Sequence, residues 1–229
     1  MAEDGETKPD MIIGIDFGMT CTGVAYINLT TGSDYASVIQ KWPGKGHLDT
    51  NKVATLLTYR LNEDVPQGWG FTCGNPNQLP EDVRYVDLWK ILLVPKELER
   101  ERTNNTSSTH DVPSNMGEVE KWCEDYLRLL YSHIEARLTT ELYGTTWQNA
   151  RIEFIFSVPT TWLDKTIVER FRFIALRAGY QRHTNHVMKI GLTEAEAAAV
   201  HVSKAQVGLF KKGSIIMSCD AGGGTTVHH

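Results

Sequence analysis

Two short segments near the two ends of the chain constrain the fold more than any other feature. Residues 12–20 read Ile-Ile-Gly-Ile-Asp-Phe-Gly-Met-Thr, and residues 215–226 read Ile-Ile-Met-Ser-Cys-Asp-Ala-Gly-Gly-Gly-Thr-Thr. In each, an apolar run typical of a buried strand ends at an aspartate, Asp16 or Asp220, and a glycine follows two residues later. Glycine lets a ligand approach the backbone closely, and successive N–H groups in such a turn form a concave anion site.

Two turns of this kind suit a polyphosphate that carries Mg²⁺. The N–H groups would bind phosphate oxygens, and the two aspartates would hold the metal mostly through its waters, because Mg²⁺ dehydrates reluctantly. Either segment alone is more often an ordinary strand turn or a flexible glycine loop. The pair, on a chain whose middle also fits, favours a nucleotide-phosphate site.

The composition excludes several function classes. Hydrophobic residues make up 41% and charged residues 22% of the 229 residues, which is typical of a globular protein with a sizeable core. The formal net charge of −5 argues against a nucleic-acid-binding surface. Four scattered cysteines form no zinc or disulfide pattern, residues 1–10 lack the apolar stretch of a signal peptide, and no apolar run is long enough to span a membrane. We expect a cytoplasmic protein of one domain or two small ones, without nucleic-acid or membrane partners.

Hydrophobic periodicity predicts alternating strands and helices. Residues 11–16 and 24–29 read as a hairpin with its turn at 18–22. Further short elements are strands over 53–60 and 69–73 and a segment over 81–93 that becomes helical at its end. The later elements are a helix over 117–142, a strand over 151–158, a helix from Asp164, a strand over 187–190, a helix over 195–203 opened by a Thr193–Glu196 capping box, and a strand over 214–219. This alternation indicates a mostly parallel α/β sheet that starts with an antiparallel hairpin.

Two polar stretches interrupt the pattern. Residues 30–51 are rich in Gly, Asp, Pro and Lys, and residues 97–115 are dominated by Glu, Arg, Thr, Asn and Ser. We expect both to be loop insertions, the second a surface loop or a disordered segment.

Four segments carry a family resemblance. They are Ile13–Thr20 (Ile-Gly-Ile-Asp-Phe-Gly-Met-Thr), Ser157–Trp162 (Ser-Val-Pro-Thr-Thr-Trp), Thr193–Ala199 (Thr-Glu-Ala-Glu-Ala-Ala-Ala) and Asp220–Thr225 (Asp-Ala-Gly-Gly-Gly-Thr). In this order they resemble the nucleotide-binding domain of the seventy-kilodalton heat-shock chaperone family, a member of the actin and sugar-kinase ATPase superfamily. The resemblance is greater to the divergent branch with large insertions than to the housekeeping chaperones.

The resemblance implies a fold and its boundaries. Residues 1–10 would be a disordered tail, and residues 11–213 would form the α/β, ribonuclease H-like first lobe of an actin-like ATPase. Residues 214–229 would be the opening strand and turn of a second lobe. On this interpretation the chain is truncated after its second phosphate loop, without the adenine side of the cleft and the helix that closes the first lobe's sheet.

The resemblance also implies a role for each matching residue, with ATP or ADP and Mg²⁺ as cofactors. Asp16 and Asp220 would lie beside the metal, and Lys90 and Glu194 would orient the γ-phosphate and the attacking water together with Asp220. Pro159 would belong to a hinge between the lobes. The two phosphate loops would consist of Gly18, Met19 and Thr20, and of Gly222, Gly223, Gly224 and Thr225.

Other interpretations of the same residues stay open. Lys90 could simply extend to solvent from a short apolar helix, and Glu194 could serve only to cap its helix. His183 and His186 are three residues apart without carboxylate partners, which favours a surface position over a metal site.

Met19 and Val227 depart from the family pattern. A thioether is a poor partner for phosphate or metal-bound water, so Met19 predicts slow hydrolysis even in a complete protein. Val227 stands where relatives usually carry an acid. Because the second lobe is expected to be missing, we expect weak Mg-ATP binding, no significant steady-state hydrolysis, self-association through an exposed sheet face, and no partner for the strand at 214–219.

Three functions are compatible with these observations. The first is an ATP-binding domain of a heat-shock-type ATPase, with co-chaperones or client proteins as partners. The second is a non-enzymatic interaction module that occupies the partners of a full-length relative. The third, a sugar or acetate kinase of the same superfamily, is disfavoured by the Val158-Pro159 strand end and the Glu194–Ala199 segment.

Overall fold

The computed structural model describes residues 8–32, 35–104, 112–162, 164–206, 208, 210, 211, 213, 215, 217, 219–221 and 226–228. A six-stranded mixed sheet forms its centre, with the strand order β3-β2-β1-β8-β9 and with β4 paired to β2 as well. The strands of this sheet are β1 (Met11–Phe17), β2 (Cys21–Asn28), β3 (Ser37–Val38), β4 (Lys52–Ala54), β8 (Ile152–Val158) and β9 (His186–Thr193). Strands β1 and β2 are antiparallel, whereas β1, β8 and β9 run parallel, which confirms the predicted hairpin and the parallel strands after it.

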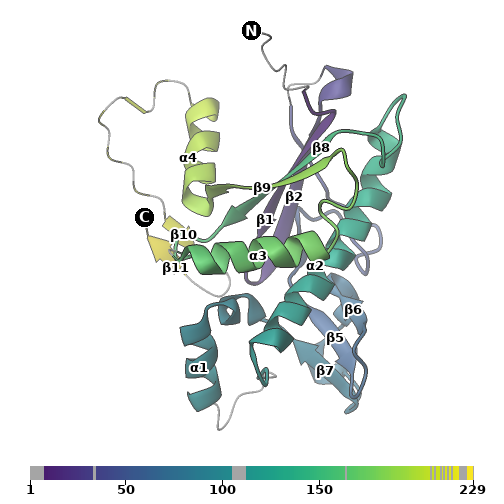
Figure 1. The fold of residues 1–229 in the computed structure, drawn as a ribbon, viewed down its shortest axis with the longest axis vertical. Helices are drawn as coiled ribbons and strands as arrows, with labels where there is room; N and C mark the ends of the chain where they lie inside the picture. The colour runs from purple at the N-terminus through teal and green to yellow at the C-terminus, as the bar shows by residue number, and fades with distance from the viewer. Residues whose placement is uncertain are drawn as a thin grey trace.

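Helices α2 (Met116–Leu138) and α3 (Lys165–Arg177) pack on one face of this sheet (Figure 1). Side chains alternate along β1 and β8, so every second residue is buried beneath these helices. Phe17 stacks on Phe171 of α3 and contacts Tyr126 of α2, with ring centroids 5.6 and 5.9 Å apart. We call this helix-covered face the inner face; the outer face carries Gly14 and Asp16.

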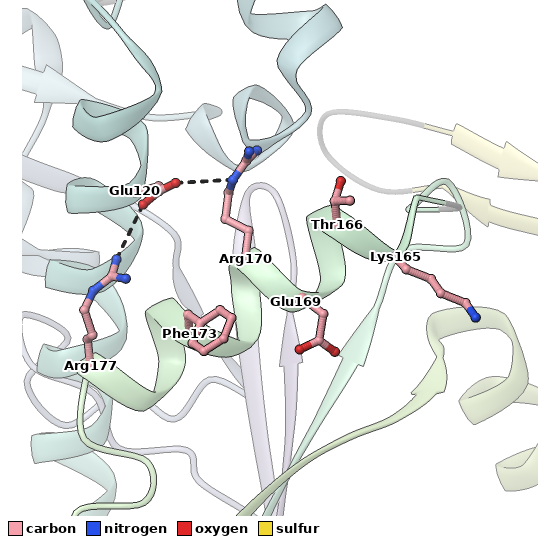
Figure 2. A pocket seen from close by; sticks show the side chains of 7 residues that line it. All are labelled: Glu120, Lys165, Thr166, Glu169, Arg170, Phe173 and Arg177. Carbon is pink, nitrogen blue, oxygen red and sulfur yellow. Dashed lines mark ion pairs between the residues drawn. The ribbon is translucent and has the colours of Figure 1, made fainter.

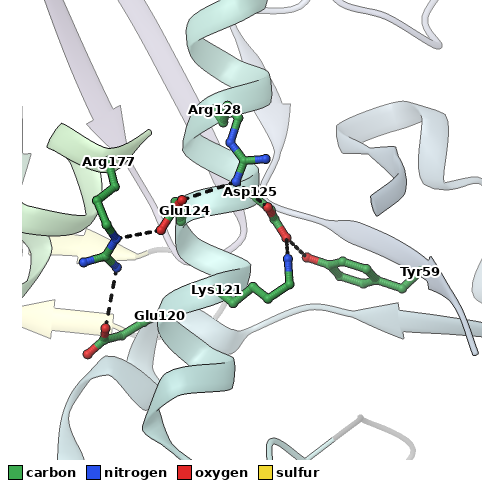
Figure 3. Close-up of polar contacts among 7 residues, drawn as sticks. All are labelled: Tyr59, Glu120, Lys121, Glu124, Asp125, Arg128 and Arg177. Carbon is green, nitrogen blue, oxygen red and sulfur yellow. Dashed lines mark hydrogen bonds and ion pairs between the residues drawn. The ribbon is translucent and has the colours of Figure 1, made fainter. Parts of the chain in front are cut away.

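A buried carboxylate fixes α2 to the neighbouring three-stranded sheet of β5 (Leu57–Arg60), β6 (Pro66–Trp69) and β7 (Val83–Val86). The Tyr59 hydroxyl donates to Asp125 Oδ2 over 3.0 Å, and Lys121 and Arg128 contact the same carboxylate at 2.8 and 2.7 Å (Figure 3). The Asp125 side chain is 1% exposed, so these three partners compensate the cost of burying its charge.

Helix α4 (Glu194–Ala205) begins with the capping box that the sequence predicts. The Thr193 hydroxyl accepts from the Glu196 N–H, and the Glu196 carboxylate accepts from the Thr193 N–H over 2.8 Å. None of its residues is buried. Figure 1 shows α4 standing away from α2 and α3.

The expectation for the last strand is wrong in two respects. Strand β10 (Cys219–Ala221) begins where the predicted strand over 214–219 would end, and it pairs antiparallel with β11 (Thr226–His228). Residues 215 and 217 are not in a strand. The hairpin partner comes from the residues after the glycine run, which sequence periodicity does not indicate.

Helix α1 (Pro95–Asn104) corrects the prediction of a loop over 97–115. Pro95 occupies the first helical position, where its missing N–H is not needed. Leu98 is buried, and Arg100 lies 3.6 Å from Glu97 one turn away. These local interactions form a helix despite the polar composition, while residues 105–111 lie outside the described part of the chain.

Two other expectations change because the chain bends, and the helical end predicted for residues 81–93 is confirmed as a 3₁₀ helix. Residues 53–60 divide into β4 and β5, since the Thr55 N–H bonds to the Thr20 carbonyl and directs the chain to the second sheet. Residues 70–73 form a 3₁₀ turn after β6, beginning at Gly70 with φ of 55°. Residues 81–93 contain β7 and a 3₁₀ helix, Trp89–Leu93, after Leu88 with φ of 54°.

No helix in the described part of the chain combines the length and apolar character needed to cross a membrane.

Candidate functional site

The turn between β1 and β2 is held in place by a glycine of its own and by Thr55, which lies between β4 and β5. A Cβ on Gly18 would lie 2.3 Å from the Cys21 carbonyl oxygen, so the turn requires glycine there. Thr55 secures both ends of the predicted phosphate loop: its hydroxyl donates to the Gly18 carbonyl over 3.0 Å and its N–H donates to the Thr20 carbonyl over 2.8 Å. The backbone of Gly18, Met19 and Thr20 is therefore fixed before any ligand binds.

Asp16 ends the outer-face row of β1 next to this turn. Its side chain is 46% exposed, and its Oδ2 atom lies 2.7 Å from the Lys52 ammonium. Strand alternation explains the position, because Ile15 and Phe17 on either side face the inner helices. A half-exposed carboxylate at a strand end can contact a ligand without a large desolvation cost.

Lys90, in the 3₁₀ helix Trp89–Leu93, contacts the end of β1 next to the same turn. Its ammonium donates to the Phe17 carbonyl and lies 3.3 Å from Glu194 Oε1. The rings of Phe17 and Trp162 lie 5.1 and 5.6 Å from it, within cation–π range. The Lys90 side chain is 5% exposed, so the alternative that it simply extends to solvent is wrong.

Burial lowers the pKa of the Lys90 ammonium, while the charges of Glu194 and Asp16 oppose this shift. The charges that act on Lys90 come from residues distant in sequence. Asp16 lies 74 residues before Lys90, and Glu194 lies 104 residues after it. Such convergence around a buried amine is typical of a functional site.

Glu194 is not needed to cap its helix. Thr193 and Glu196 form the capping box of α4, which leaves the Glu194 carboxylate to contact Lys90. The structure therefore separates the two roles that the sequence left open, and it favours contact with the site over capping.

A hollow of about 420 Å³ opens on the outer face beside Asp16. Small residues contribute to its floor and wall, among them Gly14, Gly23 and Ala197. Ser157 also lines it, and its buried hydroxyl has no hydrogen-bond partner in the described part of the chain. The rest of the lining is mostly apolar, so the exposed Asp16 carboxylate is the charged oxygen group that this hollow offers to a ligand or its bound cation.

The second predicted phosphate loop cannot be placed against the first. The backbone of Asp220 lies in β10, but its side chain and Gly222, Gly223, Gly224 and Thr225 lie outside the described residues. Their roles stay predictions. Pro159 follows β8 as expected, and its carbonyl accepts from the Trp162 N–H over 3.0 Å.

A larger hollow, of about 530 Å³, lies between α2 and α3 and away from these residues (Figure 2). Arg170 and Arg177 of α3 both contact Glu120 of α2, at 3.2 and 3.6 Å. Phe173 lies between them and is 58% exposed. The charged groups here pair with one another, which explains the hollow as a seam between two helices rather than as a catalytic centre.

The prediction that His183 and His186 favour the surface is wrong for His186, which is fully buried. Its Nε2 lies 2.9 Å from the Trp147 carbonyl, and its Nδ1 lies 3.4 Å from the Tyr131 hydroxyl. Burial lowers the pKa of this imidazole. Within the described residues no group of three or more His, Cys, Asp or Glu side chains could hold a metal.

Sequence reasoning missed three residues of the site. Lys52 fell in or next to a predicted loop, Thr55 within a predicted strand, and Trp162 within a matched segment without an assigned role. Their positions depend on the pairing of β4 with β2 and on the turn after β8. The local sequence signal for these residues is limited to Lys52 and Thr55, a lysine and a hydroxyl residue three positions apart.

The comparisons with known proteins are sparse. No protein-family model and no curated protein matches this chain. Among solved structures, MreB 5 of Spiroplasma citri bound to AMPPNP is similar, with 16% sequence identity and a TM-score of 0.42. The match covers 85% of this chain and 41% of that chain, so the chain spans less than half of that protein. The likeness is weak at these values.

Proposed function

We propose that this chain binds the phosphates of ATP or ADP together with Mg²⁺, as the first lobe of an actin-like ATPase of the heat-shock chaperone type. One observation carries the proposal: Asp16, Lys90 and Glu194, from three separate segments, converge on the glycine turn after β1. The site has the components that phosphate binding needs, namely a rigid backbone turn, a buried ammonium and a carboxylate open to solvent.

The residues present fit a magnesium ion that keeps most of its waters. Mg²⁺ is usually bound by one or two carboxylates plus phosphate oxygens, and Asp16 supplies one such carboxylate at the hollow. When bound, the metal would neutralise phosphate charge.

Each residue has a distinct part in this function. Asp16 binds the waters of the metal, and the backbone of residues 18–20 contacts phosphate oxygens. Lys90 provides a positive charge in a buried position where its electrostatic effect is stronger than in water. Glu194 keeps that ammonium charged and oriented, and it is the group that can position an attacking water.

The chaperone assignment and its partners rest on the sequence segments alone. Thr193–Ala199 and Ser157–Trp162 favour the heat-shock branch, and co-chaperones or client proteins would then be the partners. Met19 in the phosphate loop favours slow hydrolysis, because its thioether offers neither a donor nor a strong acceptor.

Equilibrium dialysis with radiolabelled ATP, with and without Mg²⁺, tests the proposal. We expect Mg²⁺-dependent binding of micromolar or weaker affinity that Asp16→Asn reduces at least about fivefold, as loss of a charged ligand group should. Lys189→Met, on the same sheet but outside the site, is the matched control and should bind like the wild type. Absence of binding at millimolar Mg-ATP, or equal binding by Asp16→Asn, would contradict the proposal.

A second candidate, the non-enzymatic interaction module, is favoured by Phe173. This ring is 58% exposed in the hollow between α2 and α3, where arginines surround it. Exposed aromatic residues flanked by arginine are frequent in protein interfaces. If the hollow mediates self-association, the mass from light scattering should rise with concentration and Phe173→Ser should abolish the rise. A constant monomer mass for both proteins would remove this support.

A further inference from the structure

Thr55 and Thr22 form an ordered pair of buried hydroxyls next to the turn between β1 and β2. Both residues are fully buried, and their Oγ1 atoms lie 2.9 Å apart. The Thr55 hydroxyl donates its one proton to the Gly18 carbonyl over 3.0 Å, because a carbonyl oxygen can only accept. Thr22 must therefore donate to Thr55, so the direction of both hydrogen bonds is determined.

The turn itself lies outside the strand pairing. Pairing of β1 with β2 ends at Phe17 and Thr22, and residues 18–20 belong to no strand. Thr55 contacts both ends of this three-residue segment, since its hydroxyl bonds to the Gly18 carbonyl and its N–H to the Thr20 carbonyl. One residue from a distant part of the sequence therefore sets the backbone of the candidate phosphate loop.

The bond to the Gly18 carbonyl determines where the next N–H group points. A trans peptide unit is planar, so its C=O and N–H bonds point in opposite directions. No peptide bond in the described part of the chain is cis. Because the Gly18 carbonyl points toward the buried Thr55 hydroxyl, the Met19 N–H points away from it. Among the described residues this N–H has no hydrogen-bond acceptor, which leaves it open to an anion.

We propose that Thr55 is a positioning residue for phosphate: its hydroxyl holds the Gly18 carbonyl and thereby presents the Met19 N–H to a phosphate oxygen of the nucleotide. The inference rests on the proposed function, because it assigns a role at the same turn. Thr55 does not contact the phosphate, since it is fully buried and its hydroxyl proton is already donated. A donor that is oriented before binding does not have to be ordered by the ligand, and this raises affinity.

The contact is made by the backbone, so it does not depend on the side chain at position 19. A methionine there is a poor side-chain partner for phosphate, yet its N–H binds an oxygen as well as that of any other residue. The hydroxyl of Thr55 is the part that cannot be replaced by an apolar group. A valine of the same shape would leave the Gly18 carbonyl without its donor, and the peptide could then rotate toward another partner.

Equilibrium dialysis of the full chain with Mg-ATP tests the inference. We expect Thr55→Val to bind at least about fivefold more weakly than the wild type, because the donor at Met19 is no longer oriented. Thr55→Ser keeps the hydroxyl and should bind like the wild type. Thr58→Val, the same substitution at a buried threonine of β5, is the matched control and should leave the affinity unchanged. Thr55→Ala also removes the hydroxyl and replaces the valine variant if that protein does not fold.

A second measurement needs no nucleotide. Relaxation of ¹⁵N nuclei gives the order parameter of the Met19 amide, which should be about 0.85, the value of rigid backbone, in the wild type, Thr55→Ser and Thr58→Val. In Thr55→Val it should fall clearly below that value. Equal ATP affinity of Thr55→Val and wild type, an equal loss in Thr58→Val, or no recovery in Thr55→Ser would each overturn the inference.

The two measurements separate this inference from the proposed function. If neither the wild type nor any variant binds ATP, while the Met19 order parameter falls in Thr55→Val alone, Thr55 orients the turn and the nucleotide function is wrong. If the wild type binds Mg-ATP and Thr55→Val binds it equally well, the nucleotide function stands and the positioning role is wrong.

Discussion

The two faces of the central sheet differ in burial and in the residues that they carry. The inner face is aromatic and aliphatic, and Phe17, Phe154 and Phe156 are buried there under α2 and α3. The outer face mixes apolar residues such as Ile155 with Gly14 and the charged Asp16, and it lines the hollow beside the first turn. Neighbouring residues of one strand therefore serve different purposes.

The two faces allow effects on stability to be separated from effects on binding. Because strand residues alternate between faces, an inner-face change should affect folding and an outer-face change should affect ligands. In β1, Ile15 and Phe17 flank Asp16. A substitution at either neighbour should therefore affect stability, whereas a substitution at Asp16 should affect binding. The predictions below test this division, starting with the largest effect.

The inner face should dominate stability. Phe156 is fully buried and contacts Phe171 and Tyr180, with ring centroids 5.3 and 4.9 Å away. We expect Phe156→Ala to lower the free energy of unfolding by about 3–5 kcal/mol. Ile155→Ala, the next residue on the outer face, should cost less than half as much. Urea unfolding followed by circular dichroism measures both, and equal costs would contradict the division into two faces.

The buried carboxylate of α2 should have the next largest effect. Asp125→Ala leaves the Tyr59 hydroxyl without its acceptor, and we expect a loss of about 2 kcal/mol in unfolding free energy. Glu124→Ala is the matched control. Its side chain is 25% exposed and pairs with Arg177 at 2.7 Å, so it should cost less than about 1 kcal/mol (Figure 3). Thermal and urea unfolding of both variants give the comparison, and a smaller cost for Asp125→Ala would show that the network is unimportant.

Lys90 links the two faces, since it is buried yet contacts the turn. Lys90→Met should weaken Mg-ATP binding about tenfold, because a charge-assisted contact is lost. The same variant should change the unfolding free energy little, since losing the cost of a buried charge offsets the loss of the hydrogen bond to the Phe17 carbonyl. Dialysis and urea unfolding separate the two effects. A large loss of stability with unchanged ATP affinity would make Lys90 a structural residue.

His186 should give the fold a mild sensitivity to acid. Burial lowers the pKa of this imidazole below its usual 6.5, with smaller opposing and supporting effects from the Trp147 carbonyl, His183 and Arg182. The unfolded chain therefore binds a proton first, so stability is complete above pH 6.5 and is lost as the pH falls below it. Between pH 7 and pH 5.5 we expect a loss of about 1 kcal/mol or less.

The acid effect can be assigned with two variants. His186→Gln should flatten the dependence of the melting temperature on pH, although His133 on α2, whose pKa burial also lowers, should leave some slope. His201→Gln, at an exposed position of α4, should leave the slope unchanged. Parallel slopes in wild type and His186→Gln would show that this histidine does not control the acid response.

The sequence predicts elements wherever a single segment carries the whole signal. The hairpin at 11–29, the apolar stripe of α2 and the Thr193–Glu196 capping box all depend on residues close in sequence, and the structure confirms them. Helix α1 and the break between β4 and β5 escape prediction. The first depends on local ion pairing within a polar stretch, and the second on the Thr55 bond to a distant turn.

The site follows the same rule. Asp16 and Gly18 are legible because strand, acid and glycine are consecutive. The contact between Lys90 and Glu194 could be anticipated only through the family resemblance, because 104 residues separate them. The pairing of Lys52 with Asp16 was not anticipated, since it depends on the register of β4, β2 and β1. Such residues become visible only when the sheet is assembled.

On the proposed function, nucleotide phosphate binds at the turn after β1, on the outer side of the sheet. Amide chemical shifts in a ¹⁵N-labelled protein test it most directly during titration with Mg-ATP. We expect the largest changes at Gly18, Met19 and Thr20, smaller changes at the inner-face residue Phe154, and loss of the pattern in Asp16→Asn. Changes centred on the hollow between α2 and α3, or no changes at millimolar Mg-ATP, would contradict the account.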